Sequence, residues 1–201
     1  MFIWSSIAHF IALTSPGPDT AIIIRQVNLH GRRAGIYAAF GIGFGIYAHC
    51  LLAINGISLF IITNDLYKLI VSLIGSIYIF YLGFMMAFPS NNVKENDQAS
   101  SSSFYGSFTS GLITNIFNIK AFIFFVSLFS ILIDSIDGLF FYIYPIYFSI
   151  TSALWFMFLS YLLTSSSTFN IERNNLINKL MALILCSIGL FIFIKSIYEY
   201  F

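Results

Sequence analysis

The chain has 201 residues, of which 59% are hydrophobic and only 8% are charged. Soluble domains carry about a quarter charged residues, so this composition excludes a water-facing surface and predicts an integral membrane protein. The formal net charge of +1 provides no basic surface for a polyanion, so we expect no nucleic-acid partner.

Six segments are long and apolar enough to cross a bilayer, which takes about 20 residues per helix. In chain order they cover residues 2–29, 36–62, 66–88, 108–133, 139–163 and 176–198. The sequence therefore predicts an all-α, polytopic membrane protein with six transmembrane helices in one domain, 1–201. We expect short loops at 134–138 and 165–175.

A polar, serine-rich stretch, residues 89–106, divides the chain into two halves, 1–88 and 107–201, and predicts a loop. Each half holds three of the apolar segments. Because three is an odd number, the second half runs through the membrane in the opposite direction to the first. The predicted architecture is therefore two inverted three-helix repeats.

The first apolar segment is interrupted at Pro16, Gly17 and Pro18, directly before Asp19. Proline lacks an amide hydrogen and clashes with the carbonyl four residues back, which predicts a broken helix. A carboxylate at bilayer depth costs at least about 2.5 kcal/mol, so it indicates a functional site. The other interpretation is that Asp19 only serves the first turn of the restarted helix, where aspartate is favoured.

The second apolar segment is rich in glycine. Gly31 and Gly35 stand four residues apart at its start, and Gly41 and Gly45 follow within it. Small residues at this spacing let helices approach closely in lipid, so we predict helix packing at these positions rather than contact with a substrate. His49 lies deeper in the same segment; we interpret it as a neutral, hydrogen-bonded histidine, with a proton relay as the alternative.

The fourth apolar segment contains a polar cluster made of Asn115, Asn118 and Lys120. Such groups face the interior of a helix bundle in lipid, although Lys120 has the alternative of extending along the bundle to the interface. Asp19 and Lys120 thus interrupt the first segment of each half. A matched pair of interrupted segments indicates the substrate site of a transporter.

These motifs resemble those of a known family. The sequence Ser-Pro-Gly-Pro-Asp at 15–19 resembles the first-span signature of the LysE/RhtB family of amino-acid exporters, and Gly-Arg-Arg-Ala-Gly at 31–35 is similar to the entry into its second span. Residues 78–83 and 111–125 resemble its third and fourth spans. That family usually reads Asn-Pro-Lys-Ala in span four, whereas 118–121 reads Asn-Ile-Lys-Ala, which leaves a break in that span undecided.

The resemblance implies a transporter rather than an enzyme, without a cofactor. It implies export of amino acids or close derivatives across the bacterial cytoplasmic (inner) membrane, driven by protons. The restarted helix at Pro18 and the charge of Lys120 would hold the substrate carboxylate. Asp19 would pair with the ammonium group or take a proton in its place, which is the chemistry of antiport. Whether the chain forms a homo-oligomer stays open.

Two other classes of function stay open as alternatives. A cation exporter needs clustered His, Cys or carboxylate ligands, but Asp19, His9 and His49 are widely spaced in the sequence. A thiol–disulfide relay needs Cys50 and Cys186 to meet, and these lie in the second and sixth segments. We therefore expect no metal site and no thiol chemistry.

The distribution of basic residues predicts how the chain is oriented. With both termini outside, the inner loops and span ends hold Arg32, Arg33, Lys94, Arg173 and Lys179. The outer side then holds Lys68 and Lys195. Because basic residues favour the cytoplasmic side, both termini are predicted outside. The first segment lacks the basic start of a cleavable signal, so we expect it to be retained.

Overall fold

The computed structural model describes residues 2–88, 104–132, 138–165 and 171–200. Within these ranges all regular structure is helical. The helices are α1 (Phe2–Thr14), α2 (Pro18–His30), α3 (Arg32–Ile54), α4 (Ile57–Thr63), α5 (Asp65–Ala87), α6 (Phe104–Ile116), α7 (Ile119–Leu132), α8 (Phe140–Ser165) and α9 (Ile171–Tyr200).

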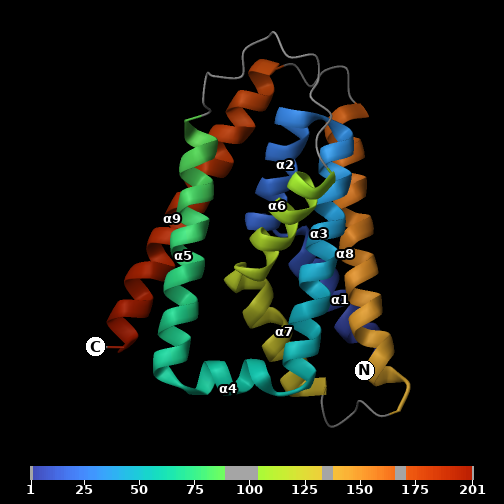
Figure 1. The fold of residues 1–201 in the computed structure, drawn as a ribbon, viewed down its shortest axis with the longest axis vertical. Helices are drawn as coiled ribbons and strands as arrows, with labels where there is room; N and C mark the ends of the chain where they lie inside the picture. Colours follow the sequence, from blue (N-terminus) through green and yellow to red (C-terminus); the bar gives the residue numbers. More distant parts are fainter. Residues whose placement is uncertain (1, 89–103, 133–137, 166–170, 201) are drawn as a thin grey trace.

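Both chain termini lie at the same end of the bundle, together with α4 (Figure 1). In the first half, α1 and α2 lead away from this end, α3 returns to it and α5 leads away again. In the second half, α6 and α7 run towards this end, α8 leads away and α9 returns (Figure 1). The two halves thus cross the bundle in opposite directions, as the odd number of segments per half predicts.

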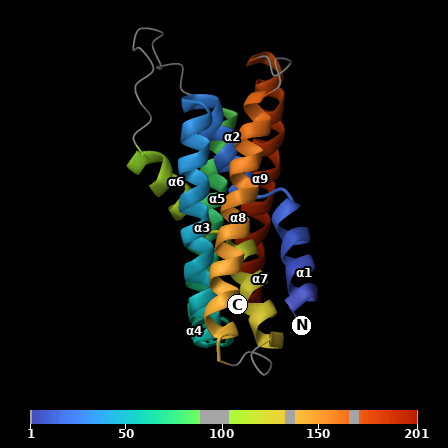
Figure 2. The ribbon, with the colours of Figure 1, turned by 90° about the vertical axis from the view of Figure 1, so that its right-hand side faces the viewer.

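The six predicted spans are confirmed by length and composition. Four stretches are each able to cross a membrane: α3, α5, α8 and Lys179–Tyr200 of α9. Two helix pairs pass the same test together, α1 with α2 and α6 with α7, although they bend by 51° and 57°. Figure 2 shows α1 at the edge of the bundle and α2 inside it, joined about midway along the bundle.

The predicted end of the second span, residue 62, is wrong. The helix α3 ends at Ile54, and Gly56 adopts a left-handed conformation with φ 72°. Glycine enters this region at no steric cost. The chain turns there into α4, which lies across the end of the bundle (Figure 1).

Two predicted loops are shorter than the sequence indicates. The helix α6 begins at Phe104, inside the expected loop 89–106, and α9 begins at Ile171, inside the expected loop 165–175. Polar and serine-rich residues led to both errors, because helix ends outside the membrane tolerate such residues. Of the predicted turn 134–138, only Gly138 lies among the described residues.

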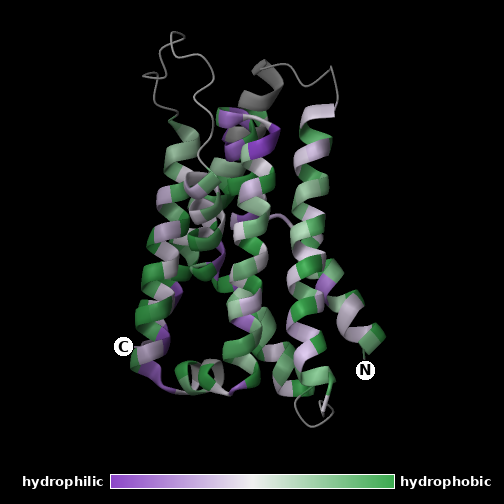
Figure 3. Ribbon diagram, turned by 45° about the vertical axis from the view of Figure 1, so that its right-hand side comes forward, coloured by the Kyte–Doolittle hydropathy of each residue, from purple (hydrophilic) through white to green (hydrophobic). Residues whose placement is uncertain are grey.

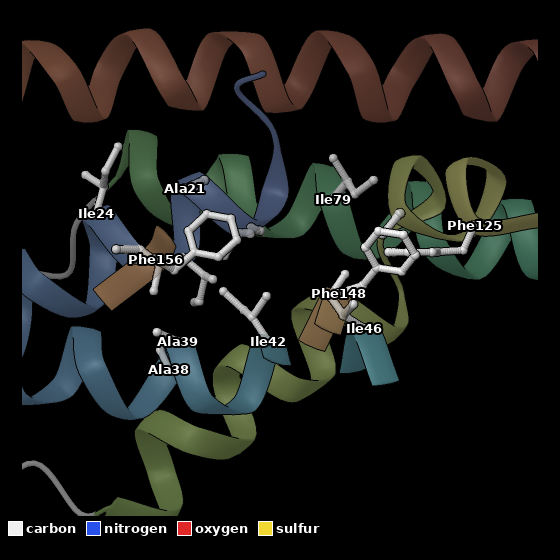
Figure 4. Packing of buried hydrophobic residues seen from close by; sticks show 14 of the residues in the cluster. Ala21, Ile24, Ala38, Ala39, Ile42, Ile46, Ile79, Phe125, Phe148 and Phe156 are labelled. Atoms are coloured by element: carbon white, nitrogen blue, oxygen red, sulfur yellow. The ribbon is translucent and has the colours of Figure 1, made fainter. Parts of the chain in front are cut away.

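The hydrophobic core lies where α2, α3, α5, α7, α8 and α9 meet. Figure 4 shows Ile42 of α3 near Phe156 of α8, and Ile46 near Phe148; all four side chains are buried. Large apolar side chains are also exposed around the bundle, as a lipid-facing surface requires. Hydrophilic residues gather at the two ends of the bundle (Figure 3).

Glycines set the closest helix contacts. A side chain at Gly41 of α3 would collide with the backbone of α6 at Phe108, and one at Gly111 of α6 would collide with Ala38 of α3. Such mutual approach is the packing that small residues allow in lipid. Gly35 likewise lies against Ser160 of α8.

The prediction that Gly31 is a packing residue is wrong. It has φ 79° and caps the end of α2, where its amide donates to Val27 O, and a Cβ there would meet nothing within 4 Å. The sequence spacing of Gly31 and Gly35 therefore reflects a tight turn followed by one packing residue.

Candidate functional site

The first break separates α1 from α2, as its prolines predict. The helix α1 ends at Thr14, Gly17 has an extended backbone with φ −179°, and Pro18 starts α2. Proline suits this first position because its missing amide hydrogen has no helical partner there. The break leaves the carbonyl of Ser15 available to side chains from elsewhere.

The second break separates α6 from α7 and forms without a proline. The helix α6 ends at Ile116, and α7 begins at Ile119. The side chain of Asn118 caps α7, since its Oδ1 accepts from the amides of Lys120 (3.1 Å) and Ala121 (3.4 Å). An asparagine cap of this kind satisfies amides that the start of a helix leaves unpaired.

A second side chain supports this break from α3. The carbonyl of Asn115 accepts from the amide of Asn118 at 2.9 Å and also from Nε2 of His49 at 2.9 Å. A carbonyl can only accept, so Nε2 carries the hydrogen. His49 is therefore a hydrogen-bonded histidine that supports the backbone of α6 where its regular bonding ends.

Two glycines let neighbouring helices reach the second break. A Cβ on Gly45 of α3 would collide with the side chain of Asn115. A Cβ on Gly75 of α5 would lie 2.7 Å from Ile119 and 3.0 Å from the carbonyl of Phe117. Gly45 thus packs against a site residue itself, which its sequence spacing did not reveal.

The carboxylate of Asp19 meets the second broken helix. Asn115 Nδ2 donates to Asp19 Oδ2 at 2.8 Å, whereas Asp19 Oδ1 and Asn115 Oδ1 are buried without a partner in the described part of the chain. Among the hydrogen bonds of the described residues, Asp19 accepts from Asn115 and from no amide of its own helix. Asp19 therefore does not act as a simple helix cap.

Lys120 reaches across to the first break. Its Nζ donates to the carbonyl of Ser15 at 2.7 Å, and its stem lies beside Gly17. Lys120 and Asp19 form no direct ion pair: the salt bridges among the described residues are Lys68–Glu199 and Lys195–Glu199. Lys120 thus turns towards the other half of the chain rather than towards an end of the bundle.

A small cavity lies between the two breaks, with a volume of about 40 Å³. It has room for a few water molecules. Its wall is made by His9, Ala12, Leu13, Ser15, Gly17, Asp19, Thr20, Ile46, Asn118, Lys120, Ala121, Phe124, Phe125 and Phe156. The structure therefore brings Asp19, Asn118 and Lys120 to one cavity, with Asn115 bonded to Asp19 behind it.

His9 also lies in this wall, whereas our sequence reasoning considered it only as a possible cation ligand and not as a substrate-site residue. It lies in α1, is 4% exposed, and its Nε2 is 3.1 Å from Ser152 Oγ of α8. The available signal was a histidine inside an apolar segment, ten residues before Asp19. That signal is weak, because buried histidines often serve only packing.

The features needed by the two alternative functions are not found in the described residues. Among them, no three His, Cys, Asp or Glu side chains group closely enough to hold a metal ion. Cys50 and Cys186 are both free thiols. Neither cysteine contributes to the wall of the cavity.

Comparison with known proteins gives consistent matches. A family described as LysE type translocator matches residues 10–196. The threonine efflux protein of Salmonella typhi is 29% identical over 144 residues, which cover 69% of each chain. The threonine efflux protein of Escherichia coli (strain K12) is 28% identical over 142 residues, again 69% of each chain. No solved structure gives a significant match.

Proposed function

Because the chain belongs to the family of LysE type translocators, we propose that it exports small amino acids from the cytoplasm by proton antiport. The observation that carries this proposal is the cavity that Asp19 and Lys120 share between two broken spans. Interrupted spans at corresponding places in two inverted halves are where secondary transporters bind their substrates. The names of the relatives make threonine the first substrate to test.

The site offers a partner for each end of a zwitterion. Asp19 would hold the ammonium group, since Oδ1 has no partner among the described residues. Lys120 would hold the carboxylate after exchanging its bond to the Ser15 carbonyl for the substrate. The start of α2 adds the positive end of a helix dipole beside it. Asn115 and Asn118 would orient these charged groups.

Antiport follows from competition at Asp19. The carboxylate would bind either the ammonium group of the substrate or a proton, and a proton arriving from outside would release the amino acid. The cavity of about 40 Å³ holds a few water molecules, and we expect its wall to move when the substrate binds. Rocking of one half against the other, about the fixed site, would supply this movement.

We further propose that the chain is one transmembrane domain of the bacterial inner membrane, with both termini outside. The α2–α3 turn carries Arg32 and Arg33, and α9, whose first half holds Lys179, begins at the same end of the bundle (Figure 1). Lys68 and Lys195 belong to the end that holds the termini, and both pair with Glu199. Among the described residues, the end without termini thus holds Arg32, Arg33 and Lys179 and the other end holds Lys68 and Lys195, and the side richer in lysine and arginine favours the cytoplasm.

The decisive experiment starts with a screen of amino acids for toxicity and accumulation in cells with and without the protein. Threonine or another small amino acid should accumulate less in cells that make it. Export is then measured in vesicles under an imposed pH gradient. We expect Asp19→Asn, which keeps size and hydrogen bonding but cannot titrate, to lose uphill transport.

Asp65→Asn serves as the matched control, because Asp65 is an exposed residue of α5 outside the cavity. It should transport like the wild type. If Asp19→Asn still transports uphill with unchanged pH dependence, the antiport mechanism is wrong. If no amino acid responds to the wild-type protein, the proposed export itself is wrong.

A further inference from the structure

We propose that His9, held by Ser152, is the specificity-determining residue that recognises a hydroxyl group on the side chain of the exported amino acid. This inference rests on the proposed function, because it assigns a third contact to the same substrate. It begins with the position of His9, which lines the cavity together with Asp19 and Lys120.

The wall of the cavity has two chemically different parts. Apart from His9, its polar residues and Gly17 lie in or beside the two breaks: Ser15, Gly17, Asp19, Thr20, Asn118 and Lys120. The remainder of the wall comes from α1, α3, α7 and α8, and apart from His9 it is apolar: Ala12, Leu13, Ile46, Ala121, Phe124, Phe125 and Phe156. When the breaks hold the ammonium and carboxylate groups, the side chain of the substrate faces this apolar part and His9.

The imidazole of His9 is held in a defined orientation. Its Nε2 lies 3.1 Å from Oγ of Ser152, a residue with no exposed surface. The ring packs against Phe148 with centroids 4.7 Å apart and against Phe125 at 5.9 Å. A ring fixed on one edge by a hydrogen bond and on its sides by aromatic contacts presents its other edge in one direction.

The second ring nitrogen remains available for a ligand. Among the described residues, no group bonds Nδ1 of His9. Unlike Nδ1 of His49, it is not one of the buried side-chain atoms that lack a partner. Since His9 lines the cavity, the proposal places this nitrogen at the cavity wall. A neutral imidazole offers one donor and one acceptor, and a hydroxyl group can complement either one.

Such a contact discriminates strongly between substrates of the same shape. A site that hydrogen-bonds a substrate hydroxyl rejects the analogue without it, because its polar group is then left unpaired. Threonine and valine have nearly the same shape and differ by this hydroxyl. The proposal therefore predicts that the protein prefers threonine to valine by about tenfold or more.

The test is counterflow of threonine and of valine in proteoliposomes containing the full-length protein. In His9→Leu we expect the threonine-to-valine ratio to fall towards one, through lost threonine transport with valine transport retained. His9→Gln should keep part of the preference, since an amide both donates and accepts. His30→Leu is the matched control, because His30 is exposed at the end of α2 and outside the cavity.

Each outcome decides the proposal. A wild-type protein without preference for threonine over valine overturns it, and so does a wild-type ratio in His9→Leu. An equal loss of both substrates in His9→Leu and His9→Gln shows a purely structural role and overturns it too. Should His9→Leu not reach the membrane, Ser152→Ala decides, since it should lower the ratio by freeing the imidazole. A protein that transports no amino acid contradicts the proposed function instead.

Discussion

Asn115 shows how much one side chain can connect in this site. Its side-chain Nδ2 donates to Asp19, its backbone carbonyl accepts from His49, and its side chain fills the space beside Gly45. A residue in this position transmits any shift of α3 to the carboxylate on α2. The position of the Asp19 carboxylate thus depends on a glycine that never contacts it.

Gly45→Ala tests this dependence. The new methyl group would collide with the Asn115 side chain, and overpacking of this kind typically costs about 1–3 kcal/mol. We expect Asn115 to be displaced from Asp19 and export to fall at least tenfold at equal protein in the membrane, measured as transport per molecule in vesicles.

Gly43→Ala is the matched control for this change. Gly43 lies on the same helix and is also tightly packed, with a Cβ there 3.1 Å from Ala153 Cβ of α8. It should disturb packing but leave Asn115 in place. Equal losses of export in the two variants would contradict a specific role for Gly45.

At the residue scale, the sequence predicted the polar cluster but not the hydrogen bonds within it. Asp19 and Lys120 are conspicuous because charges are rare in apolar segments. Their bonding partners do not follow from sequence: the structure joins Asp19 to Asn115 and Lys120 to the Ser15 carbonyl. The role of His9 also escapes sequence analysis, since it depends on α8 lying beside α1.

At the scale of the elements, the two broken spans have different physical causes. The first break is written into the local sequence by Pro16 and Pro18 and was therefore predictable. The second depends on Asn118, His49, Gly45 and Gly75, of which three lie on other helices. A break that depends on other helices cannot be predicted from the local sequence. Ile119 occupies the first position of α7, where proline is also well accommodated.

Asn118→Ala should separate the structural and functional contributions of this cap. Loss of an asparagine cap costs about 1 kcal/mol, so we expect a small decrease in thermal stability in detergent together with a large loss of export. The structural reason is that the same side chain fixes Lys120 and Ala121 at the cavity.

Asn64→Ala is a control of the same chemistry at another helix. Asn64 caps α5 by accepting from the amide of Tyr67 at 3.1 Å, and it does not line the cavity. It should lower thermal stability by a similar amount and leave export intact. If both variants retain export, Asn118 is only a cap.

The scale of the whole molecule was the most predictable from sequence, because span length and charge follow directly from the bilayer. The six spans and the opposite directions of the halves agree with the structure. The exception is α4. We predicted one long helix across the Asn55-Gly56 pair, but α3 ends before this pair and α4 begins after it. Only the left-handed conformation of Gly56 reveals the turn.

The orientation proposal predicts a labelling pattern in a chain whose Cys50 and Cys186 are replaced by alanine. Single cysteines are introduced as Asn55→Cys, at the end that holds the termini, and Arg33→Cys, at the opposite end. Both positions are exposed. In spheroplasts, an impermeant maleimide should label the first directly and the second only after lysis.

The reverse labelling pattern would overturn the orientation. The parent chain without cysteines answers a separate question, since it should export like the wild type. A loss of transport in that parent, at normal abundance in the membrane, would favour the thiol relay that we consider and do not adopt.

The different construction of the two breaks has a consequence for biosynthesis. The first can bend as soon as it leaves the ribosome, because its prolines act alone. The second needs His49 and Gly45 from α3 and Gly75 from α5, and all three are translated before it. In a permuted chain with the second half ahead of the first, the fourth span would be made before these residues. It would therefore insert as a straight helix and bend only after α3 and α5 have been made.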